Sequence, residues 1–97
     1  MIEYTLEISP AAERKLNQAF HYYQEKSPGL GIAFLEELDE CLKVLVRNPL
    51  IYRIRFDQVR RVNLKRFPYA VFYEVVANVV FVNQIIHGSS NPEYWGA

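Results

Sequence analysis

A dense run of basic side chains is the feature of this sequence that most clearly suggests chemistry. Six of the 11 Lys and Arg residues lie between positions 53 and 66, and Asp57 is the only acid among them. The six are Arg53, Arg55, Arg60, Arg61, Lys65 and Arg66. Two interpretations fit the run. Arginines on a strand edge protect it from aggregation, or their planar guanidinium groups bind an anionic partner, either nucleic acid or the acidic side chains of a protein.

The distribution of charge along the chain favours the anionic partner. The formal net charge is zero, but residues 1–46 contain eight acids and four bases, whereas residues 47–97 contain seven bases and three acids. Exposed charges are screened over about 8 Å at physiological salt, so the acidic and basic halves can act separately. The neutral total argues against a protein that coats nucleic acid or membranes by bulk charge, and we expect no sequence-specific DNA binding.

Apart from the basic run, the sequence offers few groups for catalysis. It contains no glycine-rich phosphate loop, no G-x-S-x-G motif and no H-E-x-x-H motif. The two histidines, His21 and His87, fall in different predicted elements, and neither has paired carboxylates beside it. The single cysteine, Cys41, excludes an internal disulfide and a cysteine-based zinc site. We therefore expect no metal and no cofactor.

Length and composition predict one globular domain over residues 1–97, because 97 residues leave no room for a second core. The chain is 51% hydrophobic and 14% aromatic, which is typical of a folded protein. No apolar stretch approaches the roughly 18 residues of a membrane span, and the first residues lack the pattern of a signal peptide. With one cysteine, the simplest location is a reducing cytoplasm.

The first half of the chain predicts a strand followed by two helices. Residues 2–8 alternate between apolar and polar side chains, as in a strand with one buried face. Ser9-Pro10 supplies an N-cap and a proline at the first helical position, and Ser27-Pro28 repeats this pattern before a second amphipathic helix. Asn48-Pro49 ends that helix. The short connection predicts an antiparallel helical hairpin.

The second half changes to the period of strands. Strand patterns cover residues 52–56, 59–64, 69–76 and 79–86. Ala77-Asn78 fits a two-residue hairpin turn in which Asn78 tolerates a positive φ. The expected fold is therefore α+β: an N-terminal strand, the helical hairpin, and an antiparallel sheet of three strands, or four if residues 52–56 pair.

This element order and several short motifs resemble the RelE/ParE superfamily of bacterial type II toxin–antitoxin toxins, and look closest to its ParE branch. The central motif matches at Arg61, Phe67, Pro68, Tyr69, Val71 and Tyr73. The terminal motif matches at His87, Asn91, Pro92 and Trp95, but Ser90 stands where the family has arginine. Pro28, Ile32 and Phe34 approximate a helical motif of the family, one residue out of step.

The resemblance implies a small toxin that arrests growth, as in plasmid stabilisation, and that a cognate antitoxin neutralises by wrapping a segment around it. ParE-type members bind DNA gyrase, and RelE-type members cleave mRNA on the ribosome. A ribosomal nuclease needs several cations around the scissile phosphate together with an acid/base group. Here the candidates are Arg61, Arg66, Tyr73 and His87.

We favour the gyrase-binding, non-enzymatic function. Ser90 removes one cation from the nuclease pattern, and the sequence pI of about 6.7 is low for a protein that docks on ribosomal RNA. The alternatives are a metal-independent endoribonuclease and a decayed, non-toxic binding module. We expect partners to contact the six basic residues of the run together with Trp95, and the antitoxin to cover Arg53–Arg66 with an acidic or amphipathic segment. Whether the free chain forms a homodimer is left open.

Overall fold

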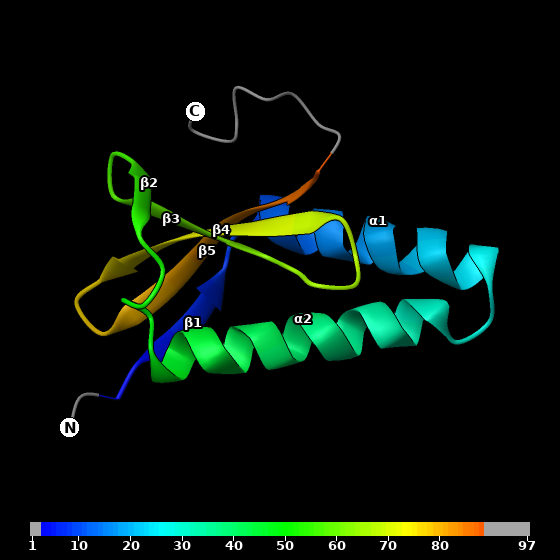
Figure 1. The fold of residues 1–97 in the computed structure, drawn as a ribbon, viewed down its shortest axis with the longest axis horizontal. Helices are drawn as coiled ribbons and strands as arrows, with labels where there is room; N and C mark the ends of the chain where they lie inside the picture. Colours follow the sequence, from blue (N-terminus) through cyan, green and yellow to red (C-terminus); the bar gives the residue numbers. More distant parts are fainter. Residues whose placement is uncertain (1–2, 89–97) are drawn as a thin grey trace.

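The computed structural model, which describes residues 3–88, places five strands and two helices in two layers (Figure 1). The elements are β1 (Thr5–Ile8), α1 (Pro10–Lys26), α2 (Leu30–Arg47), β2 (Ile54–Phe56), β3 (Val59–Asn63), β4 (Tyr69–Val76) and β5 (Val79–His87). The two helices lie antiparallel and pack against the same face of the sheet. The predicted α+β class and helical hairpin are confirmed.

The sheet has the strand order β1-β5-β4-β3-β2, so the first strand joins it as a fifth member. Thr5 to Ile8 pair in parallel with Val79 to Val82, whereas the other neighbours are antiparallel. The sheet is therefore mixed. Residues 54–56 do pair with β3, so the expected antiparallel part has four strands. This leaves β1 and β2 as the two edges.

The predicted helix start at Ser9-Pro10 is confirmed, and the one at Ser27-Pro28 is wrong. The Ser9 hydroxyl accepts a hydrogen bond from the Ala12 N–H at 3.0 Å. Ser27 instead ends α1, with its own N–H bonded to the Tyr23 carbonyl. The cap of α2 is Gly29, whose φ of 90° favours glycine. A serine-proline pair can thus end one helix as well as begin the next.

The tight turn between β4 and β5 is confirmed, but its positive φ falls on a different residue. Val76 pairs with Val79, so Ala77 and Asn78 form a two-residue loop. Ala77 has a φ of 53°, and Asn78 is not among the described residues with positive φ. A Cβ in this region costs roughly 1 kcal/mol. The turn is therefore fixed by the pairing of the two long strands and not by a favourable turn residue.

The main core lies between the sheet and the helices. It contains Phe34 and Leu45 from α2 and Tyr73 from β4, each with 0% of its surface exposed. A smaller apolar cluster, made of Val59, Ala70, Phe72 and Ile86, occupies alternate positions that point to the other sheet face. Neither α1 nor α2 combines the length and apolarity needed to cross a bilayer.

Gly31 allows the two helices to approach closely, which gives a test of the fold. A Cβ added at Gly31 would lie 2.6 Å from the Phe20 carbonyl oxygen and 2.9 Å from the Gln24 Oε1. The Gly31 N–H, in the first turn of α2, donates a hydrogen bond to that Gln24 oxygen at 3.0 Å. We expect Gly31→Ala to lower the free energy of unfolding by about 1–3 kcal/mol through overpacking, despite the better helix propensity of alanine. Urea denaturation of the purified protein measures this change.

Ile32→Ala is the matched control, because Ile32 is the next residue of α2 and is 52% exposed. It should change the stability by less than about 1 kcal/mol. An unchanged stability of Gly31→Ala would mean that the helices separate without cost, contrary to the packing described.

Candidate partner-binding surface

Four of the six residues of the basic run, Arg53, Arg55, Arg60 and Arg61, lie at one edge of the sheet, on or next to the hairpin formed by β2 and β3. We call residues 53–61 the basic hairpin. Its turn contains Asp57, which has a φ of 49°. Ile54 pairs with Arg60 and Phe56 pairs with Val59, so the register shifts at Arg55. This bulge places an extra arginine at the outer strand of the sheet.

The two neighbouring arginines of β3 point to opposite faces. Arg60 pairs with Tyr73 and therefore faces the helices, where its Nη1 donates to the Tyr52 carbonyl at 2.5 Å. Arg61 pairs with Phe72 and therefore faces the other side of the sheet. Burial, and secondarily the charge of Arg55, lower the pKa of Arg61. The two cations thus lie close enough on this face to repel each other, which an anionic partner would relieve.

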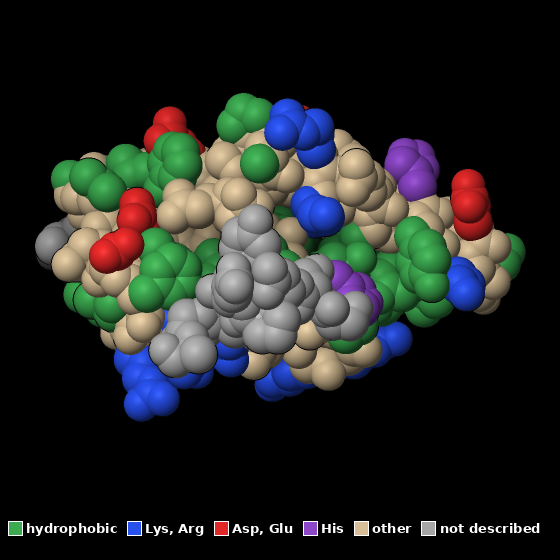
Figure 2. All heavy atoms as spheres, turned by 90° about the horizontal axis from the view of Figure 1, so that it is seen from above, with side chains coloured by type: hydrophobic (Ala, Val, Ile, Leu, Met, Phe, Trp, Pro, Cys, Tyr) green, Lys and Arg blue, Asp and Glu red, His purple; other side chains and the backbone are tan. Residues whose placement is uncertain are grey.

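Other cations of the run have no acidic partner. Within residues 3–88, the ion pairs join Lys43 to Asp39 at 3.1 Å and to Glu40 at 3.8 Å, all on α2. The side chains of Arg53, Arg55 and Lys65 are exposed and make no hydrogen bond or ion pair with any described residue. Figure 2 shows Lys and Arg side chains gathered along the lower edge of the molecule in that view. This edge is therefore open to an anion.

Apolar side chains that sequence reasoning missed accompany these cations. Leu50, Ile51, Ile54 and Phe56 are exposed by 57%, 59%, 41% and 39%. The other exposed large apolar residues of the described chain, Tyr22, Ile32 and Val76, lie in other elements. Leu50-Ile51 directly after Asn48-Pro49 was the available signal, since a loop has no core to bury them. Unpaired cations beside exposed apolar groups form an amphipathic surface, which is typical of a protein interface.

Lys65 and Arg66 lie beyond β3, in the turn before β4, where a carboxylate from α2 holds the backbone. The Lys65 N–H donates to Glu37 Oε2 at 2.5 Å, and the Arg66 N–H donates to both Glu37 oxygens at 3.1 Å. The Arg66 guanidinium lies over the Phe67 ring at 5.5 Å. Glu37 thus links the acidic helix to the basic run through the backbone and not through an ion pair.

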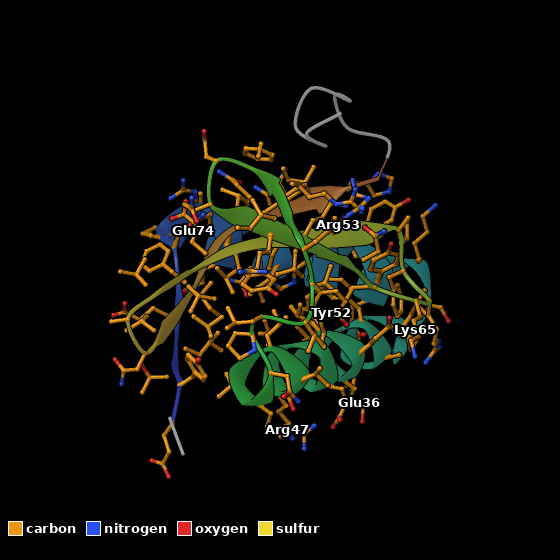
Figure 3. The ribbon with its side chains drawn as sticks, turned by 60° about the vertical axis from the view of Figure 1, so that its left-hand side comes forward. Glu36, Arg47, Tyr52, Arg53, Lys65 and Glu74 are labelled. Carbon is orange, nitrogen blue, oxygen red and sulfur yellow. The ribbon has the colours of Figure 1, made fainter. Side chains whose placement is uncertain are left out.

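A groove of about 470 Å³ separates α2 from β3 and this turn. Its walls include Glu36, Glu37 and Glu40 on one side, an apolar floor around Val62 and Leu64, and Lys65 and Arg66 at one end. Figure 3 shows Tyr52 between α2 and the strands, with Arg53 and Arg47 on opposite sides of it. Charges of both signs therefore border one apolar groove.

The four nuclease candidates do not meet in one place. The Tyr73 hydroxyl is buried and donates to the Pro49 carbonyl at 2.7 Å, and burial raises its pKa to about 12. Arg61 lies on the opposite sheet face, and Arg66 lies in the turn beside α2. His87 packs against the Tyr69 ring at 5.0 Å. The other positions of the terminal motif, Ser90, Asn91, Pro92 and Trp95, lie outside the described residues.

The described residues also offer little for a metal or a reactive thiol. No three His, Cys, Asp or Glu side chains within residues 3–88 are placed to hold a metal ion. Cys41 is half-buried in the groove wall, and burial followed by the charge of Glu37 raises the pKa of its thiol to about 11. A thiol with so high a pKa is a poor nucleophile at neutral pH.

Comparison with protein families gives a match over most of the chain. Residues 6–92 match the family model for the ParE toxin of the type II toxin–antitoxin system parDE. No curated protein sequence matches the chain closely enough to count as a relative.

Solved structures share the fold at low sequence identity. The chain resembles one from the chromosomal ParDE system of P. aeruginosa, with a TM-score of 0.76 and 20% identity over 88% of this chain and 96% of that one. The isolated E. coli RelE toxin gives a TM-score of 0.69 and 21% identity, over 95% and 92% of the two chains. A chain of the toxin–antitoxin complex RelBE2 from M. tuberculosis gives a TM-score of 0.58 and 20% identity, over 89% of this chain and 99% of that one. Identities this low show the fold alone.

Tyr73 provides a test with a defined pH dependence. Tyr73→Phe leaves the Pro49 carbonyl without its buried donor, which should cost about 1–3 kcal/mol at neutral pH. Because the folded pKa lies above the ordinary value of 10, the stability due to neutral Tyr73 is present below pH 10 and is lost as the pH rises toward 12. The difference in unfolding free energy between the two proteins should therefore narrow between pH 10 and 12.

Denaturant titrations at several pH values measure this difference. Tyr22→Phe is the control, because Tyr22 is 54% exposed, and it should change stability little at any pH. A constant difference between wild type and Tyr73→Phe across the alkaline range would contradict the buried, neutral phenol.

Proposed function

The chain belongs to the ParE toxin family and is the toxin component of a type II toxin–antitoxin system, and from this premise we propose that it acts in the cytoplasm by binding DNA gyrase and that a cognate antitoxin neutralises it. The observation that carries the proposal is the amphipathic edge of the sheet. Arg53 and Arg55 have no acidic partner among residues 3–88, and Ile54 between them is exposed. Such a surface fits a protein partner with acidic and apolar side chains.

An antitoxin segment with acidic and apolar side chains would complement the cations and exposed apolar groups of this edge. Solved structures with this fold include complexes of a toxin with its antitoxin, such as the M. tuberculosis RelBE2 complex. An acidic segment over residues 53–66 would neutralise the basic hairpin and the cations at Lys65 and Arg66, and its apolar residues would cover Leu50 and Ile51. Charge complementarity of this kind speeds association and selects the partner. We therefore place the antitoxin contact on this edge.

Binding rather than catalysis also agrees with the geometry of the nuclease candidates. A general base at neutral pH needs a pKa near 7, whereas that of Tyr73 is about 12 and its proton is committed to Pro49. Arg61 and Tyr73 lie on opposite faces of the sheet, so they cannot act on one phosphate without rearrangement. Gyrase as the target is what the resemblance of the sequence to the ParE branch implies.

Charge reversal of the exposed edge tests the antitoxin contact. In Arg53→Glu/Arg55→Glu/Lys65→Glu, three cations without an acidic partner become acids. We expect the affinity for the antitoxin encoded by the adjacent gene to fall at least about a hundredfold, because attraction becomes repulsion at the interface. The wild-type affinity should also fall with salt more steeply than that of the variant. Calorimetry or surface binding at two salt concentrations measures both effects.

Arg14→Glu/Lys15→Glu/Lys26→Glu is the matched control, since it makes the same change of net charge at exposed positions of α1. Its affinity should stay within a few fold of wild type. Equal loss of affinity in the two triple variants would place the antitoxin elsewhere and would refute the contact at the sheet edge.

A supercoiling assay tests the cellular target. Purified chain added to DNA gyrase and relaxed plasmid should block supercoiling and accumulate cleaved complexes, and prior addition of the antitoxin should restore supercoiling. No effect at a large molar excess of chain would count against gyrase.

The alternatives give different results. Cuts in ribosome-bound mRNA, mapped by primer extension and abolished by Arg61→Ala, would identify a RelE-like endoribonuclease instead. Induced expression without growth arrest, together with no effect in either assay, would identify a decayed, non-toxic binding module.

A further inference from the structure

The carboxylate of Glu37 occupies a site that the β3–β4 turn forms with its backbone. Two consecutive N–H groups, those of Lys65 and Arg66, converge on the two Glu37 oxygens, with three contacts between 2.5 and 3.1 Å. Successive N–H groups that point to one spot form a concave anion-binding nest. Glu37 comes from α2, 28 residues earlier in the chain than Lys65, so it is not part of the turn. It is a ligand that the fold supplies to the turn.

The side chains around these N–H groups add positive charge that Glu37 does not use. Lys65 and Arg66 are both exposed, and neither side chain makes an ion pair with a described carboxylate. Within residues 3–88 the Lys65 side chain makes no hydrogen bond or ion pair, and the Arg66 guanidinium lies over the Phe67 ring. An anion at the nest would therefore meet two backbone donors and two exposed cations, whereas Glu37 satisfies the backbone donors alone.

The groove gives an approach to this site. Lys65 and Arg66 form one end of the groove of about 470 Å³ that runs between α2 and β3, and Glu37 lies in its wall. The apolar residues Val62 and Leu64 line the same groove as Glu37, Lys65 and Arg66. The nest is thus a natural end point for a partner segment that carries an acidic terminus or side chain.

We infer that the N–H groups of Lys65 and Arg66, with their side chains, form an oxyanion-binding site for a phosphoryl or carboxylate group, and that Glu37 is its built-in competitor. In the free chain Glu37 fills the site. An incoming oxyanion displaces it and gains the two side-chain cations as well. Because the competitor is tethered, the apparent affinity for any external anion is the intrinsic affinity multiplied by the fraction of time that the N–H groups are free of Glu37. The site does not depend on toxin activity, so its test is separate from that of the proposed function.

Titration of ¹⁵N-labelled chain with inorganic phosphate and, separately, with acetate tests the site. In Glu37→Ala, the amide signals of Lys65 and Arg66 should shift saturably, with an apparent Kd at least about tenfold lower than in wild type. Glu37→Gln keeps the side-chain volume and one acceptor oxygen, so it should lie between the two. Tighter binding of phosphate would identify a phosphoryl group as the preferred ligand, and tighter binding of acetate would identify a carboxylate.

Glu36→Ala is the matched control. It removes the same charge from the same groove, but Glu36 is exposed and makes no contact with the turn. Its binding should resemble wild type. An equal gain in Glu36→Ala and Glu37→Ala would show a general effect of charge, and unchanged Lys65 and Arg66 signals in both Glu37 variants would show that no anion enters. Either result overturns the inference.

Discussion

The position of the basic surface depends on one buried hydrogen bond, from the hydroxyl of Tyr73 to the carbonyl of Pro49. Tyr73 has no exposed surface, and its donor is satisfied by a backbone group that no helix uses, because Pro49 lies just beyond the end of α2. A buried hydroxyl without a partner would cost several kcal/mol, so the two groups stay together. The centre of β4 thereby fixes the chain at the point where it leaves the helical layer. Farther along, the Arg60 guanidinium holds the Tyr52 carbonyl in the same way.

These two polar anchors explain why so much apolar surface stays exposed beside them. Segment 50–58 has one half-buried residue, Tyr52, and is otherwise exposed. Its place is set by hydrogen bonds at residues 49 and 52 and by pairing of β2 with β3, and not by burial of its own side chains. Leu50 and Ile51 are therefore available to a partner without any unfolding of the domain. Within residues 3–88 the acids of α2 form no ion pair with this edge: Glu37 bonds to the backbone of the turn, Asp39 and Glu40 pair with Lys43, and Glu36 is exposed.

The periodicity of apolar residues and the composition were enough to predict the α+β fold class, the helical hairpin, the strand segments and the position of the basic run. What they could not predict depends on contacts between distant residues. The parallel pairing of β1 with β5 leaves no local trace, because a strand has the same alternation in either direction. Ser27 and Pro28 have the residue types of a helix start, but Ser27 caps the end of α1 and Gly29, with a φ of 90°, precedes α2. The sequence could not predict that Glu37 binds the β3–β4 turn, because its partners are backbone N–H groups that almost any residues at positions 65 and 66 would offer.

The structure also reconciles the two interpretations of the basic run, protection of an edge and attraction of an anion. β2 is an edge strand, and an edge with exposed apolar groups such as Ile54 and Phe56 would otherwise pair with a second copy of itself. Two such edges would bring Arg53 and Arg55 against the same residues of the other copy, and like charges opposed across strands are destabilising. The same arginines attract a segment with acids at those positions. One set of side chains would therefore both disfavour self-association through β2 and, under the proposed function, select an acidic partner, whose binding would stabilise the domain by mass action.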